Sequence, residues 1–411
     1  MAQAEHAFGA RPFGPPLARG LPILALCVAA LAYAWIAIPL TLVPFTERRT
    51  WSGGVVGNDF LAFYSAARLA WGHAADAYNL PRLFAAEAAA SGTGMRLPFT
   101  YPPLFLLYAA PLAAAPYLPA LYAWIVATTA PFALVARRLS GLATLLVALS
   151  PPVIQNAIDG QNGALTASLF AGGLLLLTRG RPVLAGIAFA FLAYKPQTFL
   201  LIPICLLAAR EYRALAATVV TGAVLLLLSL AVFGVDAWRA FLAVIPQQIA
   251  FVLGDKLPVA RFPTVFVLVH HATGAAFWAN AAQAFSTLAA FALVGWCWRR
   301  APAILPRSLA FAAALPLSTP YLLEYDLAVW ALPAAILMVE LWRGEGEPPD
   351  WAALVLLWTA PPAIWLLGRA GFHGSAVFSL ALAVYAAWRA RNEAGGPSPS
   401  VPAAAADACA A

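Results

Sequence analysis

Charged side chains are scarce in this chain. Asp, Glu, Lys and Arg make up 10% of its 411 residues, and 63% of the residues are hydrophobic. Soluble domains carry roughly 25% charged residues, because a water-soluble core cannot bury apolar surface on the scale found here. The composition therefore excludes a soluble protein and predicts an integral membrane protein.

Cysteine is also rare, and its placement is uninformative for chemistry. Cys27, Cys205 and Cys297 fall inside apolar segments, and Cys409 lies close to the end of the chain. Residues so far apart indicate neither a disulfide framework nor a metal site. We expect no metal and no cofactor, with a divalent cation left open as an alternative.

Long polar runs are missing as well. Apolar segments of roughly 15 to 23 residues recur between short charged clusters, which suits α-helices that cross a hydrocarbon core of about 30 Å. The predicted fold class is an all-α polytopic membrane protein with about 11 to 13 transmembrane helices. Prolines between residues 101 and 136 leave two alternatives there: one long crossing with a short re-entrant segment, or two short helices.

The net charge of +7 raises the question of a nucleic-acid partner. Arginines gather in small groups at the ends of apolar segments rather than on one basic face, which is the pattern of cytoplasmic loops. We therefore predict no nucleic-acid partner, a plasma (inner) membrane location and a cytoplasmic N-terminus. The groups are Arg137-Arg138, Arg179 with Arg181, Arg210 with Arg213, Arg299-Arg300 with Arg307, Arg343, and Arg389 with Arg391.

This topology divides the chain into three parts. Residues 1–20 form a cytoplasmic N-terminal segment, residues 21–391 the membrane domain, and residues 392–411 a disordered cytoplasmic tail. Within the membrane domain, residues 43–100 form a first outer loop with interfacial helices, on which Phe60, Phe63, Tyr64, Ala67 and Trp71 share one face. Residues 233–277 form a second long outer segment.

Polar residues inside the apolar sequence gather on the predicted outer side. Asp59 follows the first crossing, and further clusters lie at residues 158–163, 194–196 and 317–326. Lys195 is one of only two lysines and lies between two short apolar segments. It is predicted at the floor of a cavity, where its charge needs an anionic neighbour or ligand.

Several of these motifs occur in an order that resembles glycosyltransferase family 87, of the GT-C superfamily, from about residue 57 to about residue 340. They are Asp59 with Tyr64, Ala66-Ala67, Gly72 and Tyr78; Phe99-Thr100-Tyr101-Pro102-Pro103-Leu104; Gly160-Gln161-Asn162-Gly163; and Ala185-Gly186 with Tyr194-Lys195-Pro196. The resemblance implies a GT-C-type bundle, a polyprenyl-phosphate sugar as donor, with mannose favoured, transfer on the outer face, and Asp59 as catalytic base. Many members carry a histidine after Ser-Pro, where this chain has Ser318-Thr319-Pro320-Tyr321, which leaves sugar and acceptor open.

The chemistry supports Asp59 independently. Sugar transfer from a lipid phosphate needs a base for the acceptor hydroxyl, and a partly desolvated carboxylate is suited to that role. The predicted substrate-binding residues are Tyr64, Tyr101, Asp159, Gln161, Asn162, Lys195, Tyr321, Glu324, Tyr325 and Asp326. Lys195 is assigned to phosphate or acceptor contact.

Structural alternatives stand beside these roles. The Asn58-Asp59 pair is also typical of a helix N-cap, and Lys195 of a snorkelling residue at a helix end. Residues 159–163 are also typical of a tight turn. Glu324 and Asp326 are suited to binding sugar or metal, or to capping a helix.

Two classes of function follow. The first is a hexosyltransferase that takes its sugar from a polyprenyl phosphate and passes it to a lipid or glycan acceptor, among membrane lipids. The second is a transporter or flippase of lipid-linked or small polar substrates. Transporters often contain two corresponding halves, and we find no internal repeat, so the sequence favours the enzyme.

Overall fold

The structure is a computed structural model that describes residues 16–41, 54–253 and 259–393. It is 82% helical, and its described residues contain no β-strand. The predicted all-α polytopic membrane fold is confirmed. Most of the predicted N-terminal segment 1–20 and tail 392–411, and part of the 43–100 loop, lie outside the described residues.

The described residues are mostly α-helical. The α-helices are α1 (Pro16–Thr41), α2 (Asn58–Ala70), α3 (Leu80–Ser91), α4 (Pro103–Ala109), α5 (Tyr117–Arg137), α6 (Gly141–Ala148), α7 (Pro151–Asp159), α8 (Gly163–Thr178), α9 (Pro182–Ala190), α10 (Pro196–Phe199), α11 (Leu201–Ala208), α12 (Tyr212–Leu253), α13 (Val265–Thr273), α14 (Ala276–Arg300), α15 (Ile304–Leu317), α16 (Ala331–Arg343), α17 (Pro348–Arg369) and α18 (Ala376–Glu393). Five 3-10 helices complete the described chain: η1 (Ala74–Tyr78), η2 (Ala110–Ala114), η3 (Phe191–Tyr194), η4 (Val259–Arg261) and η5 (Glu324–Trp330).

Local sequence sets many of these boundaries. The side chains of Asn79, Ser140 and Thr264 accept hydrogen bonds from the first turns of α3, α6 and α13, and so cap them. Proline opens α7, α9, α10 and α17, where its missing N–H costs nothing. The chain leaves α7 through Gly160, whose φ of 67° is left-handed and suits glycine.

Five described helices are long and apolar enough to cross a membrane, or six if the bent pair α6 and α7 is one span. The five are residues 117–137, 212–250, 276–300, 324–343 and 348–369. Shorter apolar helices, among them α8 and α15, accompany these spans. The estimate of 11 to 13 spans therefore stays a prediction.

The region of residues 101–136 contains one long helix, α5, preceded by the short α4 and η2. The short α4 and η2 end before Pro116, and α5 then runs as one long helix that contains Pro131. Pro116 has extended backbone dihedrals and precedes the first helical residue, Tyr117. The alternative of two short helices therefore does not describe this region, and the re-entrant course of the short segment stays a prediction.

The bundle is centred on α15. Every residue of α15 from Leu305 to Leu317 is buried, which is typical of a helix enclosed by others. Arg307 belongs to this buried stretch and donates hydrogen bonds to the carbonyl oxygens of Ala301 and Trp298, near the C-terminal end of α14. Arg307 is therefore a packed core residue that satisfies orphan carbonyls, and not an exposed topological charge.

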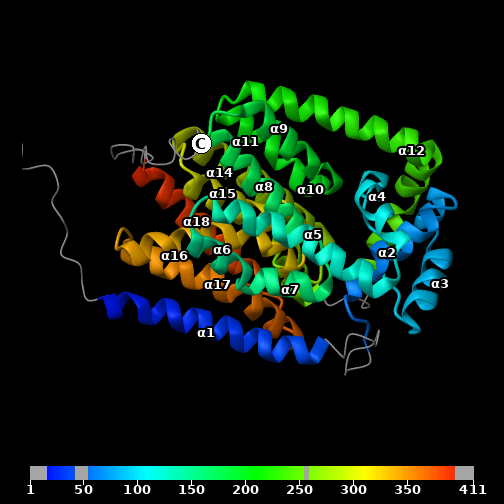
Figure 1. Ribbon diagram of the computed structural model, residues 1–411, viewed down its shortest axis with the longest axis horizontal. Helices are drawn as coiled ribbons and strands as arrows, with labels where there is room; N and C mark the ends of the chain where they lie inside the picture. Colours follow the sequence, from blue (N-terminus) through cyan, green and yellow to red (C-terminus); the bar gives the residue numbers. More distant parts are fainter. Residues whose placement is uncertain (1–15, 42–53, 254–258, 394–411) are drawn as a thin grey trace, which may run out of the picture.

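The elements of the predicted first outer loop collect at one end of the bundle. Figure 1 shows α2, α3 and α4 at the right, while α5, α16 and α18 run toward the opposite end. Phe60, Phe63, Tyr64 and Ala67 of α2 are buried, but so are Leu61, Ala62, Ser65 and Ala66 between them, so burial does not single out the predicted face, and the interfacial location stays a prediction. Trp71 differs: it is 62% exposed, because the helix ends at Ala70 and the indole N–H donates to the Ala110 carbonyl outside the core.

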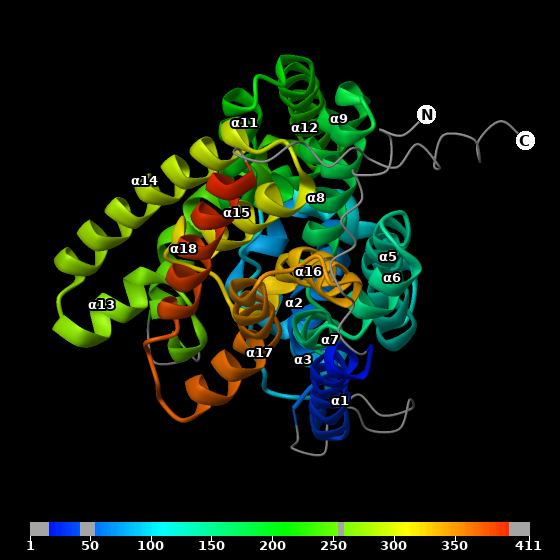
Figure 2. The same ribbon diagram turned by 90° about the vertical axis from the view of Figure 1, so that its left-hand side faces the viewer.

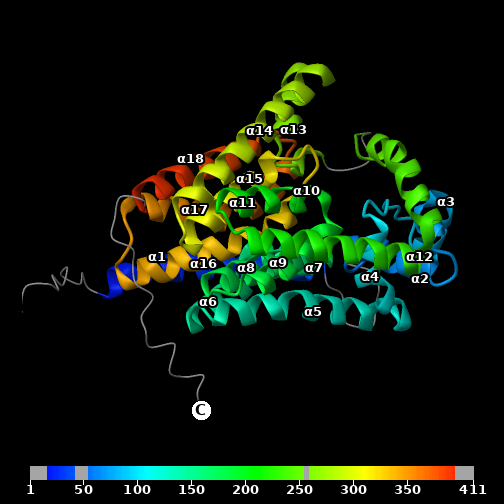
Figure 3. The same ribbon diagram turned by 90° about the horizontal axis from the view of Figure 1, so that it is seen from above.

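The predicted outer segment 233–277 is largely helical. Gly234, with φ of 78°, bends α12, and Phe241 in the following half of the helix packs against Tyr78 of η1. Figure 3 shows this half turned away from the main bundle. Figure 2 shows α13 and the start of α14 projecting from another side. Between them η4 returns to the bundle and packs against α17.

Candidate active site

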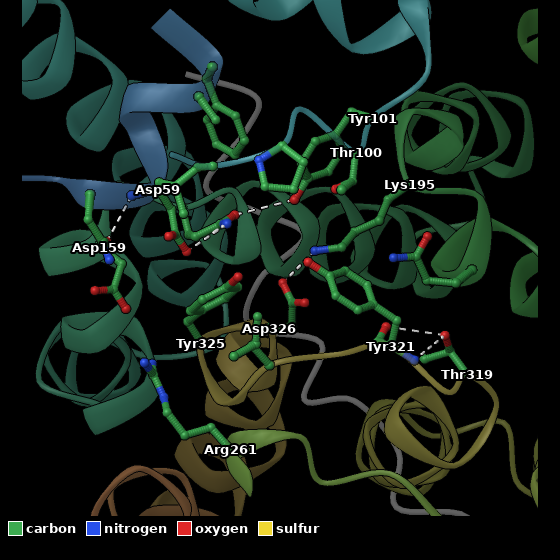
Figure 4. Close-up of a pocket in the computed structure, with 18 of the residues that line it drawn as sticks. Asp59, Thr100, Tyr101, Asp159, Lys195, Arg261, Thr319, Tyr321, Tyr325 and Asp326 are labelled. Atoms are coloured by element: carbon green, nitrogen blue, oxygen red, sulfur yellow. Dashed lines mark hydrogen bonds and ion pairs between the residues drawn. The ribbon is translucent and has the colours of Figure 1, made fainter. Parts of the chain in front are cut away.

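A cavity of about 560 Å³ lies where α2, α7, η3, η4 and η5 meet. Its walls combine carboxylates, cations, amides and tyrosines in a mostly buried setting (Figure 4). The lining residues are Asn58, Asp59, Ala62, Phe63, Met95, Arg96, Leu97, Pro98, Thr100, Tyr101, Asp159, Gln161, Lys195, Pro196, Gln197, Arg261, Thr319, Tyr321, Leu323, Tyr325 and Asp326. An enclosed polar site of this kind is typical of substrate-binding pockets.

Asp59 lies in the first turn of α2. Its backbone N–H donates to the Asn58 side chain at 2.8 Å, and its Oδ2 accepts a hydrogen bond of 3.0 Å from Gln161 Nε2. The Tyr101 hydroxyl donates in turn to Gln161 Oε1 at 3.4 Å. The Gln161 amide therefore fixes the direction in which the Asp59 carboxylate points.

Two glycines allow this approach of α2 to the turn after α7. A Cβ on Gly57 would lie 2.7 Å from Leu121, and one on Gly160 would lie 2.6 Å from the Cβ of Phe60. Both glycines also have left-handed backbones, with φ of 64° and 67°. The close approach is possible because neither glycine carries a side chain, and it places Gln161 against Asp59.

The environment of Asp59 alters its acidity. Burial raises the pKa of the Asp59 carboxyl above its usual range, while the hydrogen bond from Gln161 and the positive charge of Arg261 oppose that rise. A general base works best when its pKa is close to the working pH. The site therefore holds a carboxylate whose basicity is increased by burial and limited by its partners.

Asp159 lies beside Asp59 and is held from the other direction. Its Oδ2 accepts a hydrogen bond of 2.6 Å from Gln155 Nε2, one turn earlier on α7. Gln155 also accepts a hydrogen bond from the Tyr33 hydroxyl of α1. This chain of contacts connects α1 to the cavity wall and orients a second carboxylate near the first.

Lys195 occupies the opposite part of the cavity. Its ammonium forms an ion pair with Asp326 and donates to Asn162 Oδ1 at 3.0 Å, with only 2% of the Lys195 side chain exposed. The anionic neighbour that the sequence analysis required is therefore Asp326. Because the side chain is enclosed, the snorkelling alternative does not describe it.

Arg261, which the sequence analysis did not select, lines the cavity from η4. Its Nε donates to Glu324 Oε1 at 2.9 Å, and its Nη2 forms an ion pair with the same oxygen. Glu324 is fully buried and lies behind the arginine. The signal available in the sequence was an isolated arginine on the predicted outer side, against the usual bias.

Most of the predicted substrate-binding residues meet at this cavity. Asp59, Tyr101, Asp159, Gln161, Lys195, Tyr321, Tyr325 and Asp326 line it. Three others stand behind its wall: Glu324 binds Arg261, Asn162 binds Lys195, and the Tyr64 hydroxyl donates to the Ala115 carbonyl at 3.0 Å. Their contacts support neighbouring residues, and their predicted contact with substrate remains a prediction.

The loop before Tyr101 contributes residues that the sequence analysis also left out. Arg96 lies exposed at the cavity rim, and the next residue, Leu97, donates its backbone N–H to the buried Glu87 carboxylate at 3.0 Å. Burial raises the pKa of Glu87 to about 8, against the lowering effect of the Leu97 hydrogen bond. Thr100, Gln197 and Thr319 add further polar atoms to the walls.

Comparison with known proteins places the chain in a family. The sequence model of glycosyltransferase family 87 matches residues 99–323, which is more than half of the chain. Searches of curated proteins and of solved structures each returned no match. The matched range includes Gln161, Lys195 and Arg261, and it begins after Asp59 and ends just before Glu324. The chain belongs to glycosyltransferase family 87 and is a membrane glycosyltransferase.

Proposed function

We propose that this glycosyltransferase moves a hexose, with mannose favoured, from a polyprenyl-phosphate sugar to a lipid or glycan acceptor. Asp59 serves as general base, and the reaction takes place on the outer face of the plasma membrane. The observation that carries the proposal is the Asp59 carboxylate, half-buried in the wall of a polar cavity and oriented by the 3.0 Å hydrogen bond from Gln161.

The proposed reaction exchanges two bonds at the sugar C1 atom. The acceptor hydroxyl oxygen forms a bond to C1 as the bond between C1 and the phosphate oxygen breaks. The hydroxyl proton passes to a carboxylate oxygen of Asp59, and the lipid phosphate leaves with the electrons of the broken bond. Phosphate is a good leaving group, so the reaction needs a base but no protein acid.

The leaving phosphate adds negative charge that the cavity must offset. Lys195, Arg261 and Arg96 are the cations that line the described cavity. Lys195 and Arg261 are each paired with a carboxylate, so their positions are fixed before substrate arrives. Such preorganised charges stabilise a developing anion more effectively than mobile ones. We assign Lys195 to phosphate or acceptor contact.

Tyrosines and amides supply the sugar contacts in this proposal. Tyr101, Gln161, Tyr321 and Tyr325 line the space between Asp59 and Lys195 (Figure 4). Their hydroxyl and amide groups both donate and accept hydrogen bonds, as sugar hydroxyls require. A hexose bound between Asp59 and Lys195 would place its C1 atom between the acceptor hydroxyl and the leaving phosphate.

The test replaces the base without changing its shape. Asp59→Asn is expected to reduce transfer to background, because an amide cannot accept the proton, while expression and membrane insertion stay close to wild type. The measurement is sugar transfer in vesicles supplied with a polyprenyl-phosphate hexose and a mixed acceptor fraction. Asp236→Asn is the control, since Asp236 is an exposed carboxylate on α12 outside the cavity. Full transfer by Asp59→Asn would rule out the assignment of the base.

A donor screen with purified protein and several polyprenyl-phosphate sugars then identifies the sugar. It also separates the enzyme from the alternative of a transporter or flippase. Release of free polyprenyl phosphate together with a glycosylated product supports transfer. Movement of an unchanged lipid-linked substrate across the vesicle membrane, without such release, would favour the flippase.

A further inference from the structure

The cavity surrounds Asp59 with other ionisable groups. Those that interact with it electrostatically are Asp159 of α7, Arg261 of η4, Tyr321, Tyr325 and Asp326, with Glu324 behind Arg261. Burial and neighbouring carboxylates both favour the neutral form of a carboxylic acid. A neutral Asp59 could not accept a proton, so the site needs a positive charge that acts on it.

Two of the cations lining the described cavity are substantially buried, and they differ in what they neutralise. Lys195 is paired with Asp326 and bonded to Asn162, in the part of the cavity opposite Asp59. Arg261 is paired with Glu324, and its field also acts on both Asp59 and Asp159. Arg96 lies at the exposed rim, where water screens its charge.

Arg261 is held firmly in this position. Its Nε and Nη2 both bind Glu324 Oε1, which fixes the plane of the guanidinium group. Figure 4 shows Arg261 reaching from η4 toward Asp159, on the same side of the cavity as Asp59. An arginine is never deprotonated in a protein, so the charge is present at every working pH.

A glycine on α17 makes room for Arg261. A Cβ on Gly368 would lie 2.6 Å from Arg261 Cγ and 3.1 Å from both its Cα and its backbone N. Real Cβ atoms essentially never make contacts below 3.0 Å, so a side chain at residue 368 would force Arg261 to shift. Because Gly368 has no side chain, Arg261 can pack directly against the C-terminal end of α17.

We propose that Arg261 is a positioning residue that keeps the Asp59 carboxyl ionised, and that Gly368 sets its place. The inference rests on the function proposed above, because it concerns the same base. Arg261 acts on Asp59 by its charge, in addition to its proposed share in offsetting the leaving phosphate, and forms no bond to C1.

The pH dependence of transfer tests the inference. For Arg261→Gln, the acid limb of the kcat/KM profile is expected to move to higher pH by about one pH unit or more, with activity recovering at alkaline pH. The direction follows because losing a nearby positive charge makes the carboxylate harder to form. Arg261→Lys keeps the charge and should restore the acid limb toward that of wild type. An unshifted limb in Arg261→Gln, with activity lowered equally at every pH, would overturn the proposal.

Two further variants separate charge from folding. Arg261→Gln leaves Glu324 buried and unpaired, so the double variant Arg261→Gln with Glu324→Gln is measured beside it. The double variant should shift the limb in the same direction, and a wild-type limb in this folded variant would also overturn the proposal. Arg369→Gln, an exposed arginine outside the cavity, should leave the profile unchanged.

A substitution of Gly368 tests the position of Arg261 without removing its charge. Gly368→Ala should shift the acid limb upward as well, although it removes no charge. Gly295→Ala is its control, because a Cβ there would meet no atom closer than 3.9 Å. A wild-type profile in Gly368→Ala would contradict the proposed role of Gly368. Failure of the proposed function is distinguishable, since it would appear as transfer that survives in Asp59→Asn.

Discussion

Lys195 and Asp326 form a buried ion pair in the wall of the cavity. Both side chains are almost fully enclosed, with 2% and 7% exposed. Removing two charges from water is costly, and their mutual attraction repays this only while both are present. The pair therefore stabilises the cavity as a unit rather than as two separate contributions.

We expect Lys195→Met to destabilise the protein by about 3 to 5 kcal/mol, because Asp326 would remain as an unpaired buried charge. The double variant Lys195→Met with Asp326→Leu should recover most of that loss. The stability of both variants is measured in detergent, from unfolding transitions induced by denaturant or heat. Arg239→Met is the control: its pair with Asp236 is exposed, and such pairs contribute about 1 kcal/mol or less. A double variant as unstable as the single one would contradict the coupling.

Tyr64 shows the limit of a residue motif. Its place five residues after Asp59 suggested a substrate contact, yet its hydroxyl donates to the Ala115 carbonyl and its ring meets Tyr117 edge to face. One turn and a half of helix separates the two side chains, so Asp59 faces the cavity and Tyr64 faces the core between α2 and η2. The pattern identified a helix that lines the cavity, and only packing distinguishes the residues of α2 that face the cavity from those that face the core.

At the level of elements, the approach of α2 to the turn after α7 forms the site. Gly57 and Gly160 meet across this contact, and both pack against Leu121 of α5. Trp124, also from α5, donates its indole N–H to the Gly160 carbonyl at 3.0 Å. The long helix α5 thus acts as the support on which both functional segments rest.

Gly160→Ala is expected to lower transfer by at least tenfold, because the new methyl group would push the turn away from Phe60 and move Gln161 off Asp59. A displacement of about 1 Å at a reacting group can cost 100-fold in rate. The matched control is Gly180→Ala, which has a similar φ of 66° but meets no atom within 4 Å. Both variants carry the same backbone strain, so equal losses in the two would exclude the steric explanation.

At the scale of the whole molecule, the charge pattern and the architecture agree. The last turns of α5, α14, α16 and α18 carry the basic residues of the predicted cytoplasmic clusters. Figure 1 shows α5, α16 and α18 running away from α2, α3 and α4, beside which the cavity lies. The cavity and these basic clusters therefore lie toward opposite ends of the bundle, and the positive-inside rule predicts that the cavity faces outward.

Cysteine labelling tests this orientation. In a variant without the native cysteines, Arg82→Cys on α3 should react with an impermeant maleimide in intact cells. Arg179→Cys, after α8, should react only once the membrane is permeabilised. Both positions are exposed, so access depends on the side of the membrane. The reverse pattern would place the cavity on the cytoplasmic side and contradict the proposed location of transfer.

The sequence by itself determined the class of the protein and identified several of the residues that line the cavity. Scarce charge and long apolar segments require a helical membrane protein, since no soluble core could bury so much apolar surface. Charge clusters and motif order predicted that Asp59, Gln161, Lys195 and Asp326 belong together, and the structure brings all four to one cavity. Such signals survive in sequence because they depend on composition and local order.

The tertiary structure alone decided which charges are partners. Lys195 binds Asp326 across 131 residues, and Arg261 binds Glu324 across 63. These distances along the chain carry no periodicity that a sequence could reveal. The position of Arg261 depends on Gly368 of α17. A glycine in a sequence does not reveal whether lipid, a loop or an arginine packs against it. The environment of Asp59 is therefore a property of packing, while the presence of Asp59 is a property of the sequence.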